Sequence, residues 1–424
     1  MIRIYDSKLI TLKDILNREE TETEKVDDVV DEILKDVKKR GDAALYEYSE
    51  KFDRAKLSEL QVSQAEIDEA LQAMDADFVR TLEMAKENIT DFHKHQKREN
   101  FIINDKEGMV LGQRVTAIEK VGLYVPGGTA SYPSSVLMNA LPAKIAGVKE
   151  IVMVSPPGKD GNISQVILAA AKIAGVTKIF KIGGAQAIAA LAYGTKSVPK
   201  VDKIVGPGNI YVATAKRMVF GVVDIDMIAG PSEILVLADG SCNPRFVAAD
   251  MLSQAEHDKL ATTVLVTDSR TLAEAVQKEL EVQLAVLPRE EIARVSIENN
   301  GKIIIAGDMK EAVAISNAIA PEHLEICVDD PFSLLNSIEN AGSVFLGKNV
   351  PEALGDYFAG PNHVLPTSGT ARFSSPLGVD DFVKRSSFIY YTKEALSQVQ
   401  ERVVSFAESE GLHAHAKSVS IRFE

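Results

Sequence analysis

Five of the seven histidines lie in short polar stretches in the second half of the chain. In SQAEHD, Gln254 and His257 are three residues apart, so on a helix both side chains project from one face and can chelate one ion. The alternative is the last turn of a helix, where a histidine interacts favourably with the helix dipole. The other two histidines, His93 and His95, stand among lysines and arginines, and we expect them to be solvated.

A second stretch, APEHLEI, places Glu322 and His323 next to each other at the entry to an expected strand. Neighbouring strand residues point to opposite faces, but at the first residues of a strand both side chains can reach a crevice. A carboxylate beside an imidazole supplies two proton acceptors of different basicity. The alternative is a helix-to-strand loop with solvated charges.

A third stretch, GDYFAGPNHVLPT (355–367), holds Asp356 and His363 among two glycines and two prolines, without helical or strand period. A solvated loop needs no such mixture, whereas a metal or substrate site would use it. The tail stretch EGLHAHA adds Glu410, His413 and His415, with an exposed tail as the alternative.

Together, Gln254, His257, Asp356 and one tail histidine make a set of four nitrogen and oxygen donors. Such a set suits Zn²⁺, with Mn²⁺ and Co²⁺ as less favoured occupants. No thiolate takes part, so a structural cysteine-type site is excluded. Spacing in sequence does not show that these residues meet in space. We interpret three less distinctive acids as surface or packing charges: Asp258, Glu325 and Asp381.

The two cysteines, Cys242 in a turn and Cys327 in an expected strand, are far apart in sequence. A pair of cysteines excludes a disulfide scaffold and favours a reducing compartment. We interpret each as a small buried hydrophobe rather than a nucleophile.

The composition restricts the partners. The 424 residues carry a net charge of −14, which argues against nucleic acid because its binding normally needs a basic face. The apolar runs are of strand length, too short to span a membrane, and the first residues lack the pattern of a secretory signal. We therefore expect a cytoplasmic protein with a small-molecule ligand.

The elements that must position these residues follow an α/β pattern. An apolar stripe over 26–37 predicts a helix that ends at Gly41. Four apolar strands each run into a glycine turn and a helical segment, namely VGLYVPGG, EIVMVSPPG, KIFKIGGAQ and VDKIVGPGN. This alternation predicts a parallel sheet, and such sheets bind ligands at the carboxyl ends of their strands. The fingerprint G-x-G-x-x-G is absent, so the glycines alone do not support a dinucleotide site.

The pattern resumes after residue 232 with the strands ATTVLVTD, GKIIIAG, HLEICVDD and GSVFLG. We therefore predict an α/β fold of two Rossmann-like, doubly wound parallel-sheet domains, one inserted in the other, with a short N-terminal arm and a C-terminal helical tail. The predicted boundaries are an arm over 1–20, one domain over 21–120 and 233–377, the inserted domain over 121–232, and the tail over 378–424.

The order of the motifs resembles the histidinol dehydrogenase family. The matching segments, from about residue 120 to the C-terminus, are GLYVPGGTASYPSS, IGGAQAIAALAYGT, KIVGPGNIYVATAK, IAGPSEILVLAD, SQAEHD, APEHLEI, GDYFAGPNHVLPTSGTARF and EGLHAHAKSV.

The resemblance implies the last two steps of histidine biosynthesis, from L-histidinol through bound histidinaldehyde to L-histidine, with two NAD⁺ and one water. It implies one zinc per subunit, held by Gln254, His257, Asp356 and His415. His415 is preferred over His413 because the family's ligand precedes an Ala-Lys segment.

The resemblance also assigns the other roles. Glu322 and His323 match the catalytic pair. NAD contacts fall on Tyr124, Gln186 and Asn209, in the domain over 121–232. The implied substrate-binding residues are Ser232, Gln254, His257, His323, Asp356, His363, Glu410 and His415. The family's tail reaches into the other subunit, so the resemblance implies a homodimer with shared active sites.

Three rival interpretations remain. A zinc-dependent hydrolase would use the same ligands, with Glu322 as the base for a metal-bound water and no need for NAD. An aldehyde dehydrogenase would use Cys327 as its nucleophile. A sensor or scaffold protein would keep the fold without turnover.

Overall fold

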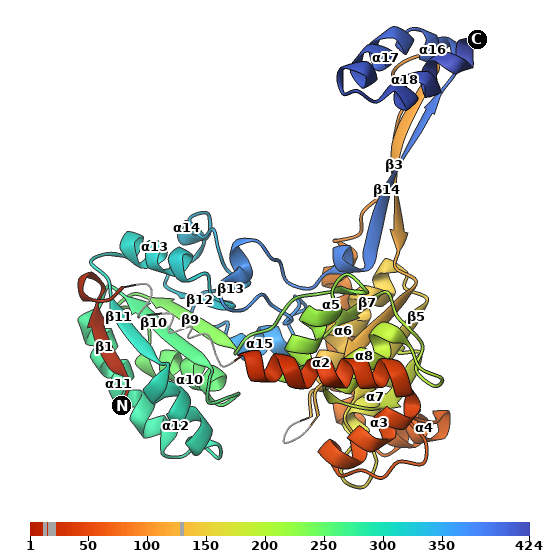
Figure 1. The fold of residues 1–424 in the computed structure, drawn as a ribbon. Helices are drawn as coiled ribbons and strands as arrows, with labels where there is room; N and C mark the ends of the chain where they lie inside the picture. Colours follow the sequence, from red (N-terminus) through yellow and green to blue (C-terminus); the bar gives the residue numbers. More distant parts are fainter. Residues whose placement is uncertain (12–14, 16–22, 128–130) are drawn as a thin grey trace. The chain divides into compact units, whose positions relative to one another are not determined.

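The computed structural model describes residues 1–11, 15, 23–127 and 131–424 (Figure 1). The chain forms two compact units. The first comprises Met1–Gln96 and Ile118–Phe382, and the second comprises Lys97–Ala117 and Val383–Glu424.

The first unit contains two parallel sheets. The five-stranded sheet has, in spatial order, β6 (Lys178–Lys181), β5 (Glu150–Ser155), β4 (Lys120–Tyr124), β7 (Lys203–Val205) and β8 (Asp224–Ile225). The six-stranded sheet has β1 (Arg3–Asp6), β11 (Lys302–Ile305), β10 (Thr262–Thr267), β9 (Glu233–Ala238), β12 (His323–Cys327) and β13 (Ser343–Leu346). Apart from β1, both sheets have the same doubly wound order, which reverses between β4 and β7 and between β9 and β12.

Helices follow the strands of both sheets, as the apolar runs and glycine turns predict. The five-stranded sheet alternates with α6 (Pro133–Ala146), α7 (Gln165–Ala174), α8 (Gly184–Tyr193) and α9 (Ile210–Val219). The six-stranded sheet alternates with α10 (Pro244–Ala255), α11 (Arg270–Leu284), α12 (Glu290–Asn299), α13 (Met309–Ile319), α14 (Phe332–Leu335) and α15 (Glu352–Tyr357). The central strands are buried along nearly their whole length, which explains their apolar runs.

The N-terminal helices pack on the five-stranded sheet rather than on the other one. They are α2 (Thr23–Arg40), α3 (Asp42–Tyr48), α4 (Gln64–Gln72) and α5 (Ala76–Lys94). Val30, Ile33 and Val37 of α2 share one core with Phe180 of β6, and α2 lies along α8 (Figure 1). This packing differs from our expectation, which grouped 21–120 with 233–377. An apolar stripe shows that a helix face is buried, but not which domain buries it.

The N-terminus also differs from the expected arm. Arg3–Asp6 is an edge strand that pairs in parallel with β11. The rest of the expected arm lies partly outside the described residues. The predicted end of α2 is confirmed, because Gly41 has a φ of 58° and donates its N–H to the Val37 carbonyl at 2.9 Å.

The second unit is built on an antiparallel sheet in the order β14 (Val383–Tyr391), β3 (Met109–Ala117) and β2 (Phe101–Ile103). Its α-helices all lie in the C-terminal tail and are α16 (Lys393–Ser397), α17 (Gln400–Ser409) and α18 (His413–Ser420). The predicted helical tail is confirmed, but the sequence analysis missed β14. Its partner β3 comes much earlier in the chain, with Val383 opposite Ala117 and Tyr391 opposite Met109, so no local hairpin signal exists.

The two cysteines meet at the carboxyl ends of neighbouring strands. Cys242 follows β9 and Cys327 ends β12, and the structure joins them in a disulfide with a Cα–Cα distance of 6.4 Å. Both are buried, as expected, but the pairing corrects the interpretation of two separate residues. In the described part of the chain, no helix combines the length and the apolar character needed to cross a membrane.

Candidate active site and metal centre

A cavity of about 290 Å³ in the first unit is lined by both parallel sheets. The five-stranded sheet contributes Pro126, after β4, and the loop Gly206–Asn209, after β7. The six-stranded sheet contributes Ser232, before β9, and Glu322 and His323, at the start of β12. The cavity therefore borders carboxyl ends of one sheet and amino ends of the other.

Gln254 and His257 come from the end of α10. Gln254 lies in the last turn and His257 just beyond it, and the His257 N–H donates to the Gln254 carbonyl at 3.2 Å. Both predicted contexts, the shared face and the helix end, thus apply. The Gln254 side chain is 1% exposed and lies against the Glu352 carboxylate. With its amide nitrogen turned to that carboxylate, its oxygen accepts from the Glu233 N–H at 3.2 Å.

Glu322 and His323 are both buried, and the backbone of Glu233 holds them. The Glu322 carboxylate accepts the Glu233 N–H at 2.8 Å. The Glu233 carbonyl lies 3.1 Å from His323 Nδ1, and because a carbonyl can only accept, Nδ1 carries a proton. His323 Nε2 is buried and has no hydrogen-bond partner among the described residues. The second ring nitrogen is therefore left for the cavity.

Asp356 stands in a helix and not, as the sequence analysis expected, in a loop. It lies one turn after Glu352 in α15, a helix of six residues that is too short to show a period in the sequence. Its Oδ1 lies 3.7 Å from His323 Nε2, and Glu352 Oε1 lies 3.9 Å from the same nitrogen.

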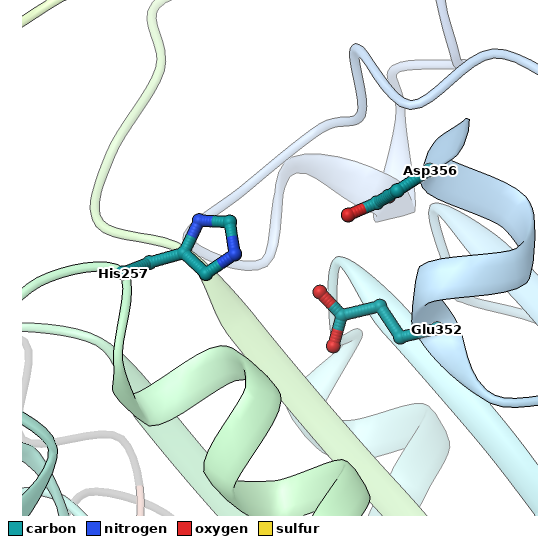
Figure 2. A group of neighbouring side chains, drawn as sticks. All are labelled: His257, Glu352 and Asp356. Carbon is teal, nitrogen blue, oxygen red and sulfur yellow. The ribbon is translucent and has the colours of Figure 1, made fainter. Parts of the chain in front are cut away.

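Figure 2 shows the His257 imidazole facing the carboxylates of Glu352 and Asp356. These three residues offer ligand atoms that all lie within 4.8 Å of one another. Glu352 is not among the residues predicted from the sequence. Its only signal is its spacing of four residues from Asp356, which places both on one face only if the segment is helical.

Burial and mutual repulsion shape the charges of this group. Burial raises the pKa of Glu322 to about 7 and that of Glu352 to about 8, and Asp356 adds to both effects. Burial alone would lower the pKa of His323, but Glu352, Glu322 and Asp356 hold it well above its usual value. Burial lowers the pKa of His257, which keeps its imidazole neutral and able to bind a metal.

These donors fit a zinc ion. A neutral imidazole, two carboxylates and an amide form a nitrogen and oxygen set of the kind that zinc accepts. A divalent cation would also neutralise carboxylates that now repel one another in a buried place.

His363 is held over the cavity by two hydrogen bonds. Its Nδ1 donates to the Asp356 carbonyl at 3.1 Å, and the Ser135 hydroxyl donates to its Nε2 at 3.4 Å. The loop before it is anchored by Asn362, whose amide donates to the Met138 carbonyl at 2.7 Å. The structure therefore brings Ser232 and His363, two of the predicted substrate residues, to the same cavity as Asp356.

The three predicted cofactor residues differ in exposure. Asn209 is exposed, lines the cavity and caps α9 by accepting the N–H groups of Tyr211 and Val212. Tyr124 and Gln186 are buried beneath the strand ends. The Tyr124 hydroxyl accepts the Gly184 N–H at 3.1 Å, at the start of α8.

A buried ion pair fixes the loop that begins at Gly206. Lys216 donates to the Gly206 carbonyl at 2.9 Å, and Asp226 accepts the Gly206 N–H at 2.7 Å. Lys216 and Asp226 also pair with each other. Both line the cavity, and the sequence analysis missed them because neither stands in a recognisable motif.

The tail residues belong to the second unit. Glu410 is the C-cap of α17, and His413 and His415 lie in the first turn of α18, all three exposed. The first unit thus brings together three of the four predicted zinc ligands, Gln254, His257 and Asp356, and His415 stays a prediction.

The three acids interpreted as surface or packing charges have different places. Asp258 is exposed, and Asp381 is partly buried at 3.7 Å from Lys203. Glu325 is buried, and its Oε1 accepts the Glu352 N–H at 2.8 Å. Glu325 is therefore part of the structure behind the site rather than a surface charge.

Two sheets of doubly wound order and a cavity with buried carboxylates and imidazoles define a Rossmann-like α/β enzyme with a candidate metal centre. The sequence model of the family described as histidinol dehydrogenase matches residues 16–423. The chain belongs to the histidinol dehydrogenase family.

Individual relatives agree with this assignment. The chain is 57% identical to a histidinol dehydrogenase of Listeria monocytogenes over 98% of both chains. It is 58% identical to one of Syntrophotalea carbinolica, over 97% of this chain and 95% of that protein. The crystal structure of histidinol dehydrogenase from Elizabethkingia anophelis has a TM-score of 0.95 and 39% identity, and the match covers 100% of this chain and 98% of that chain.

Proposed function

We propose that this protein oxidises L-histidinol to L-histidine in the cytoplasm, through bound histidinaldehyde, with two hydride transfers to two NAD⁺ and the addition of one water. The observation that carries the proposal is one cavity that brings His257, Glu352 and Asp356 close enough together to hold a metal ion, beside the buried pair Glu322 and His323. Family membership supports the same reaction.

Gln254, His257 and Asp356 would hold one zinc ion, with His415 from a second copy of the chain as the fourth ligand. Glu352 is close enough to add a carboxylate. A bound zinc would supply a template that orients the amino alcohol and its imidazole ring.

His323 would take up the alcohol proton in the first oxidation. Its Nδ1 proton is engaged by the Glu233 carbonyl, so Nε2 is the nitrogen that can accept. Without a cation, the carboxylates of Glu352, Glu322 and Asp356 raise the pKa of His323 and favour the protonated ring. A divalent cation held by Glu352 and Asp356 would offset this effect and leave Nε2 free to accept the proton. Bound NAD⁺ would supply the hydride acceptor for this step.

Glu322 would act in the second oxidation. Its pKa of about 7 suits a general base at neutral pH. It would remove a proton from the water that adds to the aldehyde, and the hydrate formed in this way would give up the second hydride.

The cofactor would lie along the loop Gly206–Asn209, on the side of the cavity that the five-stranded sheet provides. Asn209 faces the cavity and can contact NAD directly. Tyr124 and Gln186 are buried, so they would act on the cofactor by fixing the strand ends and the backbone of Gly184.

Ser232 and His363 would bind the substrate together with the ligand residues. Glu410 and His415 would come from a second copy, so that the homodimer shares its sites. Large apolar side chains on the second unit support pairing, since Ile389 is 74% and Phe406 is 69% exposed.

The decisive measurement is the amount of NADH formed per L-histidinol consumed, with and without prior chelation. Two NADH per histidinol, lost on chelation and regained with Zn²⁺, supports the proposal. A single NADH indicates an ordinary alcohol dehydrogenase. Turnover of an ester or amide without NAD would favour the zinc-dependent hydrolase.

A mixing experiment tests the shared sites. Subunits with His415→Asn and subunits with Glu322→Gln should each form little L-histidine alone and should regain part of this overall conversion as mixed dimers. If mixed dimers form but stay inactive, each site is built within one chain. His413→Asn is the matched control, because His415→Asn should lower the zinc content whereas His413→Asn should leave it unchanged.

A further inference from the structure

Glu325 lies behind the candidate metal centre, between the two helices that carry its ligands. It stands two residues after His323 in β12, and this strand is flanked by β9 and β13. Its side chain is 3% exposed. A buried carboxyl group in the middle of a sheet is costly unless it is hydrogen-bonded, so its partners indicate what it is for.

The first partner is the start of α15. Glu325 Oε1 accepts the N–H of Glu352, the first residue of that helix, at 2.8 Å. The N-cap residue is Pro351, whose side chain has no group that could accept this proton. A helix of six residues does not hold itself in water, so its position depends on such anchors. Glu325 therefore fixes the helix that carries Glu352 and Asp356.

The second partner is Asp250 on α10, one turn before Gln254. The carboxyl groups of Asp250 and Glu325 lie near enough for a shared hydrogen bond, and Asp250, after burial, helps to raise the pKa of Glu325. One of the two must carry a proton, since an ionised carboxylate can only accept. Asp250 belongs to the helix whose last turn holds Gln254 and which leads into His257. The same side chain thus reaches both ligand-bearing helices.

We propose that Glu325 is a positioning residue that ties α10 to α15 and so sets the spacing between His257 and the carboxylates of α15. The inference rests on the proposed metal centre, because that spacing matters only if the three groups hold an ion. Glu325 does not touch the cavity and takes no part in proton transfer.

Two substitutions of Glu325 distinguish the effect of its hydrogen bonds from the effect of its packing volume. In Glu325→Gln, the amide oxygen can accept the Glu352 N–H and the amide nitrogen can donate to Asp250, as the protonated acid does. In Glu325→Leu, a side chain of similar size keeps the volume but removes both hydrogen bonds. A third variant, Asp250→Ala at a partly buried position, removes only the tie to α10.

The experiment is a zinc titration of the metal-stripped full-length protein in competition with a chromogenic chelator, alongside thermal unfolding. Loss of outer hydrogen bonds typically weakens metal binding about 10- to 100-fold, and we expect this for Glu325→Leu. Asp250→Ala should show a smaller weakening, and Glu325→Gln should bind zinc nearly as the wild type does. Asn243→Ala is the control for stability, because it removes the cap at the opposite end of α10.

The outcomes are distinct. Wild-type zinc affinity in folded Glu325→Leu overturns the inference, and if that variant does not fold, unchanged affinity in Asp250→Ala does so. An equal weakening in Asn243→Ala also overturns it, because the effect would then follow stability alone. If wild type and His257→Asn bind zinc equally poorly, the metal centre itself fails, and the inference fails with it. A normal wild type with a defective His257→Asn leaves Glu325 as the only point under test.

Discussion

The five-stranded and the six-stranded sheet have the same reversing strand order, and each borders the cavity with the pair of strands at which that order reverses. The ends differ. β4 and β7 reach the cavity with their carboxyl ends, through Pro126 and Gly206, whereas β9 and β12 reach it with their amino ends. The first cavity wall therefore lies where we expected ligands to bind, at carboxyl ends of strands, and the second wall lies at the opposite ends.

The chemistry of the two edges differs as well. The carboxyl-end edge presents glycine, proline and asparagine, which allow close approach to the backbone but exchange no protons near neutral pH. The amino-end edge presents buried carboxylates and imidazoles, because α10 runs back along the strands and ends there with Gln254 and His257. One edge is thus suited to bind a cofactor and the other to hold an ion and move protons.

The carboxyl ends of β9 and β12 are closed. The Cys242–Cys327 disulfide joins them, and Lys348 donates to the Ser241 carbonyl at 3.1 Å and pairs with Asp329 at 2.6 Å. A shared strand order therefore does not determine which end of the strands lines the site. Side chains that close one end and line the other decide it.

The largest expected effect is at the amino-end edge. Glu322→Gln can still accept the Glu233 N–H but cannot take a proton from water, so aldehyde oxidation should slow by about 100- to 10,000-fold. Alcohol oxidation should suffer much less. Rates measured separately with L-histidinol and with histidinaldehyde check this.

An equal loss with both substrates would contradict the water-activating role of Glu322 and would assign it to substrate binding. Wild-type enzyme supplied with histidinaldehyde is the reference for the second half of the reaction.

The Glu322 carboxyl group predicts a pH dependence of aldehyde oxidation. Burial raises the pKa of Glu322 to about 7, and its ionised form is the active base. Aldehyde oxidation should therefore rise roughly tenfold per pH unit below this value and level off above it. The pH profile of kcat/KM for histidinaldehyde checks this prediction. If kcat/KM falls at low pH in Glu322→Gln as it does in the wild type, another group causes that fall.

A smaller effect is expected at the carboxyl-end edge. Asn209→Ala and Asn243→Ala each remove an N-cap, from α9 and from α10, so each should cost about 0.5–2 kcal/mol of stability. Only Asn209 lines the cavity, so only its loss should raise the KM for NAD, roughly 2- to 10-fold, the worth of one hydrogen bond. Steady-state kinetics at saturating histidinol separate the two variants.

If both variants raise the KM for NAD alike, the cofactor edge is not where we place it. If Asn209→Ala instead lowers the zinc content, the carboxyl-end edge also contributes to the metal site.

The strands and helices around the cavity could be predicted because their apolar runs and glycine turns are local signals. The burial of His93 could not, since it depends on a distant loop. Its Nδ1 donates to the Ile89 carbonyl at 2.8 Å, and Asn362 lies 3.4 Å from its other ring nitrogen. The expectation that His93 is solvated was wrong because a charged neighbourhood in the sequence does not reveal the inner face of a helix. His95, two residues on, is exposed as expected.

The residues of the site also fall into those with a local sequence signal and those that depend on distant contacts. The pairs Gln254 with His257 and Glu322 with His323 carried their own spacing signals, and the structure brings them together. Glu352 could not be found, because it shares a face with Asp356 only in a short helix that Glu325 anchors from another strand. Local spacing thus predicts pairs, whereas the complete cluster depends on contacts between distant strands and helices.

The smallest expected effect on turnover is at the closed end of the six-stranded sheet. Cys327→Ala should leave both oxidations nearly unchanged, because Cys327 lies at the opposite end of β12 from His323 and is paired with Cys242. Stability should fall by about 2–4 kcal/mol when the disulfide is lost. Denaturant unfolding of the oxidised and reduced wild type beside the variant checks the expected loss of stability.

Cys242→Ala breaks the same bond, so it must match Cys327→Ala in both measurements. A loss of aldehyde oxidation in Cys327→Ala alone would support a cysteine nucleophile and would place chemistry at the carboxyl ends of β9 and β12.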